Sequence, residues 1–494
     1  MRRLYLNCDF SGIQDYVLGV KSGKAQAKRL RARSFLLELF EHAALATIRD
    51  RFGVADDDVL IRGGGGFLVR LPSDGSDSEL EKTRAELQRR LWEESGGEVH
   101  MSIGWGESDI QARRSLELEK RRPANSTLLT DGAWDSLNFS LPPMGDPCEV
   151  CGQAPGTRRV QDDDGDDDLH CSYCLRAREI GERLTRWERM STVAPGAGQV
   201  EALGVTFRET DRTAPDSFRV GRWTPRNSNG APLTFKQISA LSTGDSRLAI
   251  LKADVDDMGV RVGEIARDDP SYGLLRGFSA DLHAFFGEAV QRMLEEDWRD
   301  IYTVYSGGDD LLLVGPWDQA LDFAGALAGQ FDAGPGQRYA ITISAGIAFS
   351  PYRVPIRRGV DRAETLLESA KEREGKNSCA ALDAIWSWDR HDAIIGEGKR
   401  LADWIESRAA SRSLLHRLLT LLEASDPGET AMREARWAYQ VERNASGTEF
   451  REWGRRALYR SEPDGRRPKQ GDELAELAAE VRYALLSTRT RGGD

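Results

Sequence analysis

The chain has 494 residues and a formal net charge of −12, and its composition is 40% hydrophobic and 30% charged. This length exceeds what one hydrophobic core normally supports, so we expect three or four domains. The negative charge argues against a uniformly basic nucleic-acid-binding protein, although one local basic face can still contact RNA. No run of about 18 apolar residues is present, and Met1-Arg2-Arg3-Leu4 leads into a predicted strand instead of a signal sequence. These features argue against a membrane protein and predict a soluble, cytoplasmic one.

Strand and helix patterns alternate in the first 140 residues. A short strand at 3–8 precedes Asp9-Phe10-Ser11-Gly12-Ile13-Gln14, and apolar residues then recur with helical spacing from about 25 to 49. Two short apolar runs flank the four glycines of residues 63–66, as expected for a β-hairpin. A helix at about 79–94, a strand at 99–105 and a helix at about 109–121 complete this unit.

Two cysteine pairs follow, in Cys148-Glu149-Val150-Cys151 and in Cys171-Ser172-Tyr173-Cys174. This spacing is typical of zinc knuckles, in which four thiolates complete a tetrahedron. Four thiolates leave no open coordination position, so we predict a structural Zn²⁺ and not a catalytic one. A redox role or nucleic-acid contact is the weaker alternative. Residues 195–245 are rich in Gly, Pro, Ser and Thr and are predicted to form an irregular connector.

The order of elements in the first unit recurs in the second half of the chain. A strand ends at Asp254, a helix follows at about 274–298, and a hairpin spans 301–314. A helix at about 317–332, a strand at 339–349 and a helix at about 361–374 complete the series. This is the β-α-β-β-α-β order of ferredoxin-like and polymerase-palm modules. Three segments correspond between the copies: 9–12 with 254–257, 63–66 with 307–310, and 102–104 with 344–346.

We therefore predict an α+β fold with two ferredoxin-like or polymerase-palm domains packed as a pseudo-dimer, a zinc-bearing insert domain and a C-terminal helical bundle. Beyond residue 385 the pattern is wholly helical. An Arg-rich stretch there, 451–467, can face RNA or a protein partner, and a solvated helical face is an equal alternative. The predicted domains are 1–140 (first palm, non-catalytic), 141–244 (zinc-knuckle domain and connector), 245–390 (catalytic second palm) and 391–494 (C-terminal helical domain).

The hairpin turn of the second copy holds two adjacent carboxylates, Asp309 and Asp310, after two glycines. Standing alone, this is also compatible with an ordinary turn. Because the strand ending at Asp254 delivers a third carboxylate to the same sheet, we predict a two-metal phosphoryl-transfer site that uses Mg²⁺ or Mn²⁺. The first copy has glycines at the hairpin positions and cannot hold two metals. For one of Asp256 and Asp257 we expect only helix capping and solvation.

Four features in this order resemble the large subunit of type III CRISPR effector complexes, the Csm/Cmr polymerase-cyclase family. They are Asp9-Phe10-Ser11-Gly12-Ile13-Gln14, the four-cysteine knuckle, Ser306-Gly307-Gly308-Asp309-Asp310, and Gly375-Lys376-Asn377. The resemblance implies target-RNA-activated synthesis of cyclic oligoadenylate second messengers from ATP, in antiviral defence. It also implies guide RNA, target RNA and other Csm/Cmr-type subunits as partners.

By the same resemblance, Asp254 and Asp309 would hold two metal ions, with Asp310 assisting. The implied nucleotide contacts include Lys371 and Lys376 on the phosphates, although a lysine near a helix C-terminus also complements the helix dipole. The remaining implied nucleotide-binding residues are Ser306, Gly307 and Gly308 in the second palm, and Ser11, Gly12 and the 63–66 turn with Gly64 in the first palm, which would hold a second ATP.

Many members of this family begin with a histidine-aspartate (HD) nuclease domain, whereas this chain starts at the first palm. We therefore expect no DNase activity from such a domain, and we interpret His391-Asp392 as a surface pair. Two alternatives remain for the function. One is a cyclase with a different product, an AMP conjugate or a cyclic dinucleotide, since base choice cannot be read from the sequence. The other is a non-enzymatic scaffold of the ribonucleoprotein.

Overall fold

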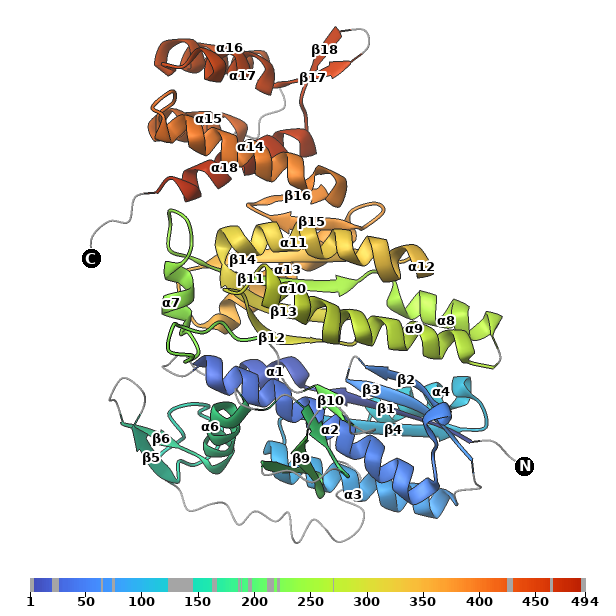
Figure 1. Ribbon diagram of the computed structural model, residues 1–494. Coiled ribbons are helices and arrows are strands. Elements are labelled where there is room, and N and C mark those ends of the chain that lie inside the picture. Colours follow the sequence, from blue (N-terminus) through green and yellow to red (C-terminus); the bar gives the residue numbers. More distant parts are fainter. Residues whose placement is uncertain are drawn as a thin grey trace.

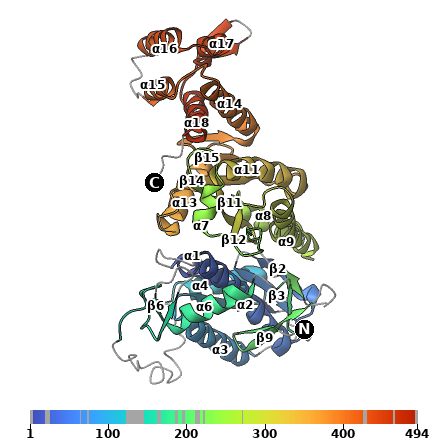
Figure 2. The same ribbon diagram turned by 60° about the vertical axis from the view of Figure 1, so that its left-hand side comes forward.

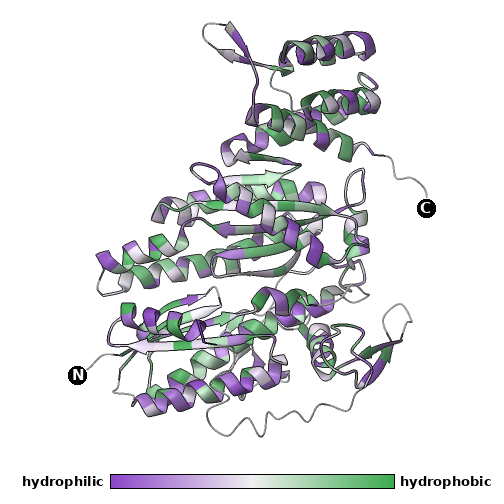
Figure 3. Cartoon of the chain, turned by 180° about the vertical axis from the view of Figure 1, so that it is seen from behind, coloured by the Kyte–Doolittle hydropathy of each residue, from purple (hydrophilic) through white to green (hydrophobic). Residues whose placement is uncertain are grey.

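The computed structural model has a mixed α/β architecture arranged in tiers, with two four-stranded β-sheets at the bottom, a six-stranded β-sheet in the middle and a group of helices at the top (Figures 1 and 2). Strands of the central sheet are strongly hydrophobic, and the helices around it carry polar outer faces (Figure 3). The structure describes residues 4–19, 26–63, 65–72, 76–122, 145–161, 167–184, 187, 189–193, 198–210, 217–219, 223–269, 271–423, 430–462 and 465–489.

One sheet of the bottom tier, called the lower sheet below, has the strand order β2-β3-β1-β4, and all its neighbouring strands are antiparallel. Alternate residues of β1 (Leu4, Leu6, Cys8 and Phe10) are buried in one large core that also contains apolar residues of α2. The elements are β1 (Leu4–Ser11), α1 (Ile13–Leu18), α2 (Gln26–Phe52), η1 (Asp56–Asp58), β2 (Val59–Gly63), β3 (Gly66–Leu71), α3 (Asp77–Ser95), β4 (His100–Gly106) and α4 (Asp109–Lys120).

Residues 195–245 contain regular structure, so the prediction of a wholly irregular connector is wrong. Strands β8 and β9 form a hairpin through Gly204, whose φ of 79° suits a tight turn. These strands bury alternate apolar residues, Val200, Ala202 and Phe207, in the core shared with β1 and α2. The alternation is short, and the many Gly, Pro, Ser and Thr residues around it led to the prediction of an irregular segment. The elements are β5 (Arg158–Gln161), β6 (Asp167–His170), α6 (Ser172–Arg183), β7 (Arg189–Ser191), β8 (Gln199–Ala202), β9 (Val205–Thr210), β10 (Phe218–Arg219) and α7 (Phe235–Ala240).

The six-stranded sheet of the middle tier, called the upper sheet below, has the order β12-β13-β11-β14-β15-β16. Its neighbouring strands are antiparallel except β14 and β15. The single helix predicted at 274–298 is two helices joined by a π-helical turn, and an additional helix precedes them. The elements are β11 (Leu248–Val255), α8 (Met258–Asp268), α9 (Gly273–Ala284), η4 (Phe285–Ala289), α10 (Val290–Glu296), β12 (Tyr302–Gly307), β13 (Asp310–Pro316), α11 (Trp317–Phe331), η5 (Asp332–Gly336), α12 (Gln337–Tyr339), β14 (Ile343–Ser350), α13 (Ile356–Glu372), β15 (Ser378–Ala381) and β16 (Ala384–Ser387).

The C-terminal region has a separate apolar core, which includes Trp404, Leu418, Trp437 and Phe450. It is not wholly helical, because Tyr459–Glu462 pair antiparallel with Gly465–Pro468; Pro468 lacks the N–H that a continuing helix would need. The elements are α14 (Trp388–Glu406), α15 (Arg412–Glu423), α16 (Thr430–Asn444), α17 (Thr448–Ala457), β17 (Tyr459–Glu462), β18 (Gly465–Pro468) and α18 (Asp472–Ser487).

His391 on α14 is buried, so the prediction that it belongs to a surface pair is wrong. Its Nδ1 lies 3.1 Å from Trp386 Nε1, and its Nε2 lies 3.0 Å from the carbonyl oxygen of Leu321. These contacts satisfy both ring nitrogens within the core. No helix among the described residues is long and apolar enough to cross a membrane.

The lower sheet with its helices (residues 4–120, the lower unit) and the upper sheet with its helices (residues 248–387, the upper unit) contact each other through two reciprocal pairs of elements. Helix α9 of the upper unit packs against β2 of the lower unit, and α2 of the lower unit packs against β12 of the upper one. At the first contact, Arg62 N donates to Ser279 Oγ at 3.1 Å; at the second, Tyr302 Oη donates to the carbonyl oxygen of Ala27 at 2.7 Å. The two glycine turns also meet, since a Cβ added to Gly63 would lie 3.0 Å from Gly308 Cα.

Candidate nucleotide and metal site

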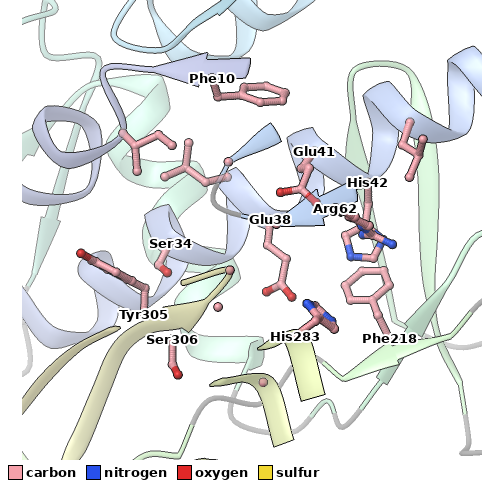
Figure 4. A pocket seen from close by; sticks show the side chains of 18 of the residues that line it. Phe10, Ser34, Glu38, Glu41, His42, Arg62, Phe218, His283, Tyr305 and Ser306 are labelled. Atoms are coloured by element: carbon pink, nitrogen blue, oxygen red, sulfur yellow. Dashed lines mark hydrogen bonds and ion pairs between the residues drawn. The ribbon is translucent and has the colours of Figure 1, made fainter. Parts of the chain in front are cut away.

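A cavity of about 1280 Å³ lies where the two glycine turns meet, and residues of both units line it. The hairpin residues Ser306–Asp310 and Asp254 form one wall, and Gly63 and Gly65 lie opposite. The cavity-facing side of α2 forms another wall. Figure 4 shows Glu38 of α2 and His283 of α9 pointing toward each other across the cavity. This volume is sufficient for a ligand larger than a typical drug-sized molecule.

The sheet register brings the predicted carboxylates together at this cavity. Asp254 at the end of β11 is directly opposite Asp310 at the start of β13, and the Asp309 carbonyl accepts a bond from Val255 N at 3.0 Å. All three aspartates line the same cavity. Tyr305 Oη donates to Asp310 Oδ2 at 2.9 Å, and Lys371 Nζ donates to Asp254 Oδ2.

The carboxylates are electrostatically strained, as their raised pKa values indicate. Burial, followed by the charge of Asp254, raises the pKa of Asp309 to about 6. Burial, followed by the charge of Asp309, raises the pKa of Asp310 to about 7, against the lowering effect of the Tyr305 hydroxyl. Burial also raises the pKa of Asp254, and the Lys371 ammonium opposes that shift. A divalent cation bound between these groups would relieve their repulsion.

The oxygen donors present fit Mg²⁺ or Mn²⁺, because hard cations prefer carboxylate ligands. The three aspartates do not yet form a closed ligand set. Within the described part of the chain, the four cysteines are the only group of three or more possible ligand residues whose ligand atoms lie within 4.8 Å of one another. The Lys371 ammonium already neutralises one side of Asp254. A bound metal would therefore have to draw the aspartates closer together.

Asp256 has a role that the sequence does not indicate. It is only 3% exposed, and its Oδ2 accepts bonds from Thr342 Oγ1 at 2.7 Å and Ser344 Oγ at 3.0 Å. Its Oδ1 is buried without a hydrogen-bond partner. Asp257, by contrast, is exposed and pairs with Lys376 Nζ at 2.5 Å. Asp257 is therefore the solvated residue of the two. Asp256 instead holds the segment after β11 against β14 through its hydrogen bonds to Thr342 and Ser344.

The remaining predicted nucleotide contacts differ in their placement. Ser306 lines the cavity, but its hydroxyl donates to the carbonyl oxygen of Phe286 at 2.6 Å, which anchors the hairpin to the π-helical turn η4. Gly307 and Gly308 line the cavity and leave the backbone accessible. Lys371 and Lys376 are not among the lining residues: Lys371 pairs with Asp254, which lines the cavity, and Lys376 pairs with Asp257, which does not.

In the lower unit, Phe10 and Ile13 line the cavity next to Ser11 and Gly12, which are not among its lining residues. Gly12 starts α1 with φ of 79°, and a Cβ there would lie 2.5 Å from the carbonyl oxygen of Glu98. Gly64 lies outside the described residues, between the cavity-lining Gly63 and Gly65.

Sequence reasoning missed the polar residues of α2 that line the cavity. Glu38, Glu41 and His42 lie at helical spacing on one face, and Arg62 Nε donates to Glu41 Oε1 at 3.1 Å (Figure 4). The His42 ring stacks on Phe218, with ring centroids 3.6 Å apart, and burial holds its pKa well below the usual value. Their spacing at i, i+3 and i+4 was the available signal, because it marks a polar stripe on an otherwise buried helix.

Cys148, Cys151, Cys171 and Cys174 lie together and are buried, as the spacing predicted. The Sγ atoms of Cys151 and Cys171 are 3.8 Å apart, which matches the sulfur–sulfur separation of about 3.8 Å expected for Zn–S bonds of about 2.3 Å in a tetrahedron. Backbone N–H groups point at the thiolates, with Cys171 N 3.3 Å from Cys148 Sγ. The donor set therefore fits a closed, structural Zn²⁺ site.

Comparisons with known proteins agree with this arrangement. Residues 247–380 match the family model of the Cas10/Cmr2 second palm domain, and residues 3–123 match that of Csm1 subunit domain B. The upper sheet and its hairpin of carboxylates therefore define a palm-domain protein. The chain as a whole is similar to the Cas10/Csm1 large subunits of type III-A CRISPR systems.

Two relatives described as the CRISPR system single-strand-specific deoxyribonuclease Cas10/Csm1 (subtype III-A) show the extent of the match. The chain is 27% identical to the protein of Thermococcus onnurineus (strain NA1), with 89% of this chain and 64% of the relative covered. It is 24% identical to that of Mycobacterium tuberculosis (strain ATCC 25618 / H37Rv), with 89% and 62% covered. The chain thus spans less than two thirds of the length of these relatives.

Solved structures share the fold. A chain of the Csm1–Csm4 subcomplex in the type III-A CRISPR-Csm interference complex matches with a TM-score of 0.71 and 21% identity, covering 99% of this chain and 70% of that one. Csm1–Csm4 cassettes in complex with cA3 and with one ATP each match with a TM-score of 0.69 and 21% identity, with the same coverage.

Proposed function

We propose that this chain is a metal-dependent nucleotidyltransferase that makes cyclic oligoadenylate second messengers from ATP. It would act as the large subunit of a type III CRISPR RNA-guided antiviral effector complex and respond to target RNA. The observation that carries this proposal is the convergence of Asp254, Asp309 and Asp310 on one large cavity between the two units. Related folds solved with ATP and with cA3 agree with a cavity of this kind.

In this proposal, Asp254, Asp309 and Asp310 hold two Mg²⁺ or Mn²⁺ ions. When bound, the metals supply charge neutralisation at the attacking 3′-oxygen, at the α-phosphate and at the leaving pyrophosphate. The backbone of Gly307 and Gly308 admits the nucleotide close to the hairpin. Lys371 and Lys376 exchange their carboxylate partners for phosphate oxygens, which keeps each ammonium paired throughout.

We further propose that the two sheets form a pseudo-dimer, with a second ATP in the lower unit. Asp9 pairs in register with Gly66 and Ser102, as Asp254 pairs with Asp310 and Ser344. Lys120 Nζ lies 3.0 Å from Asp9 Oδ2, in the same relation as Lys371 to Asp254. The lower unit therefore keeps the aspartate–lysine pair but lacks the hairpin carboxylates, as expected for a site that binds a nucleotide without reacting on it. The lining residues proposed there are Ser11, Gly12 and Gly64.

The other assignments complete the proposal. The domains are 1–140, 141–244 with a structural Zn²⁺, 245–390 and 391–494. The partners are ATP, guide RNA, target RNA and other Csm-type subunits, and the location is the cytoplasm. Support for a protein partner comes from related folds solved with Csm4.

The test is incubation of the chain, alone and in its guide-loaded complex with target RNA, with labelled ATP and Mg²⁺, followed by mass spectrometry of the products. We expect cyclic adenylates that depend on target RNA and disappear in an Asp309→Ala, Asp310→Ala variant. The exposed pair Asp297→Ala, Asp361→Ala is the matched control and should retain activity. An AMP conjugate or cyclic dinucleotide would change the product assignment, and no turnover under any condition would favour a scaffold.

A further inference from the structure

Helix α2 carries three arginines, at 29, 31 and 33, that are only 2%, 6% and 2% exposed. Burying a guanidinium is unfavourable unless charged or polar groups compensate it. Two of these side chains contact the cysteine-bearing segment, and the third contacts the upper part of the molecule. Their partners therefore show which elements α2 connects.

Two of the arginines reach the four-cysteine centre. Arg33 Nη2 lies 4.0 Å from Cys174 Sγ, and the same guanidinium donates to Glu98 Oε2 at 3.1 Å. Arg29 Nη2 lies 3.2 Å from Nε2 of His170, the residue before Cys171. Four thiolates around one Zn²⁺ would leave a double negative charge, next to which Arg33, shared with Glu98, places a buried guanidinium group.

The backbones of α2 and α6 are also in close contact. A Cβ added to Gly181 of α6 would lie 2.4 Å from the carbonyl oxygen of Lys28. Helix α6 begins between Cys171 and Cys174, so its position depends on the cysteine centre. The first half of α2 is thus fixed against a helix that starts within the cysteine centre.

The third arginine connects α2 to the upper sheet. Arg31 Nη1 donates to Thr224 Oγ1 at 2.9 Å, and its guanidinium lies 6.0 Å from the ring centroid of Tyr302. Tyr302 in turn donates to the carbonyl oxygen of Ala27 at 2.7 Å. Tyr302 is the first residue of β12, the strand that ends at the glycine turn of the candidate site.

The next turns of the same helix form a wall of the cavity. Ser34, Glu38, Glu41 and His42 line it, and Figure 4 shows these side chains around the space between the two units. Because an α-helix is stiff over a few turns, a shift at Arg29 and Arg33 would displace this wall.

We infer that Arg29 and Arg33 are positioning residues that couple the four-cysteine centre to the nucleotide cavity through α2. The metal would then control nucleotide affinity without contacting the nucleotide. This inference rests on the proposed function insofar as the cavity is taken to bind ATP.

The test uses the full chain and three variants. Arg33→Met removes the charge next to Cys174, Arg33→Lys keeps it, and Arg89→Met makes the same change at an exposed site on α3. For each protein we would measure zinc content, amide hydrogen exchange of residues 26–52, and the Kd of a fluorescent, non-hydrolysable ATP analogue with Mg²⁺. We expect Arg33→Met to retain zinc, exchange faster over residues 34–45 and bind the analogue about tenfold more weakly. Arg33→Lys should recover most of the affinity, and Arg89→Met should match the wild type.

If Arg33→Met fails to fold, the coupling is tested on the wild type instead, by removing its zinc with a chelator and repeating the exchange and Kd measurements. Faster exchange in α2 with weaker analogue binding, both reversed by added Zn²⁺, would support the coupling. Unchanged exchange and Kd after zinc removal would overturn it, as would an Arg33→Met variant with normal exchange and affinity. A wild type that binds no nucleotide would refute the proposed function, whereas the exchange data would still decide whether zinc orders α2.

Discussion

Asp310 is held by the fold in an environment that disfavours its charge, so Asp310→Asn should stabilise the metal-free protein while it abolishes activity. Its pKa is about 7 in the folded chain and near 3.8 when unperturbed. Because the folded value is the higher one, the stability that protonation confers is complete below about pH 3.8 and is lost as the pH rises through about 7. The wild type should therefore lose stability between pH 5.5 and 8.5, and the asparagine variant should lose less.

The size of the effect follows from the same two pKa values. Between about pH 5.5 and 8.5 the difference amounts to about 2 kcal/mol, since one pKa unit corresponds to about 1.4 kcal/mol. For a unit of about 150 residues this corresponds to a shift in Tm of about 4–8 °C. Solvent that reaches the carboxylate from the cavity would reduce this value.

Thermal unfolding of both proteins across this pH range, without added divalent cation, is the assay. Asp297→Asn, an exposed change of the same chemistry, is the control and should follow the wild type at every pH. Added Mg²⁺ should then stabilise the wild type at pH 8, by about 2.7 kcal/mol at a hundredfold excess over Kd, and the Asp310 variant less. Parallel pH profiles for wild type and Asp310→Asn would refute the argument that Asp310 is electrostatically strained.

Three further changes test other contacts. Tyr305→Phe removes a hydrogen bond to the Asp310 carboxylate, so the pKa of Asp310 should rise further and the pH–rate profile should move up by about one pH unit; an unmoved profile would contradict the contact. Cys148→Ser should abolish stoichiometric zinc binding, measured by metal analysis, and lower Tm, whereas full zinc content would argue against a four-thiolate site. Gly63→Ala places a Cβ against the opposite glycine turn, whereas in the control Gly53→Ala the added Cβ meets nothing within 4 Å. Gly63→Ala should therefore reduce Tm and ATP turnover more than Gly53→Ala does. Equal effects would mean that the turns do not touch.

Several features of this protein were determined by local sequence. The hairpin with two glycines and two aspartates and the strand ending at Asp254 place three carboxylates on one sheet edge, because strand register follows from short apolar runs and a tight turn. The spacing of the four cysteines likewise predicts their cluster, since each pair forms one knuckle. Such signals lie within a few residues of one another, so a single sequence contains them.

Other features depended on contacts between distant segments. The cavity lies between units that are held together by the packing of α2 against β12 and of α9 against β2. The sequence of α2 does not by itself indicate that Glu38 lines the same cavity as Asp254. The burial of Asp256 under Thr342, and that of His391 between Trp386 and Leu321, also required the folded chain. Local sequence determines which groups an element carries, whereas the free energy of packing distant elements determines which of those groups become buried and which share a cavity.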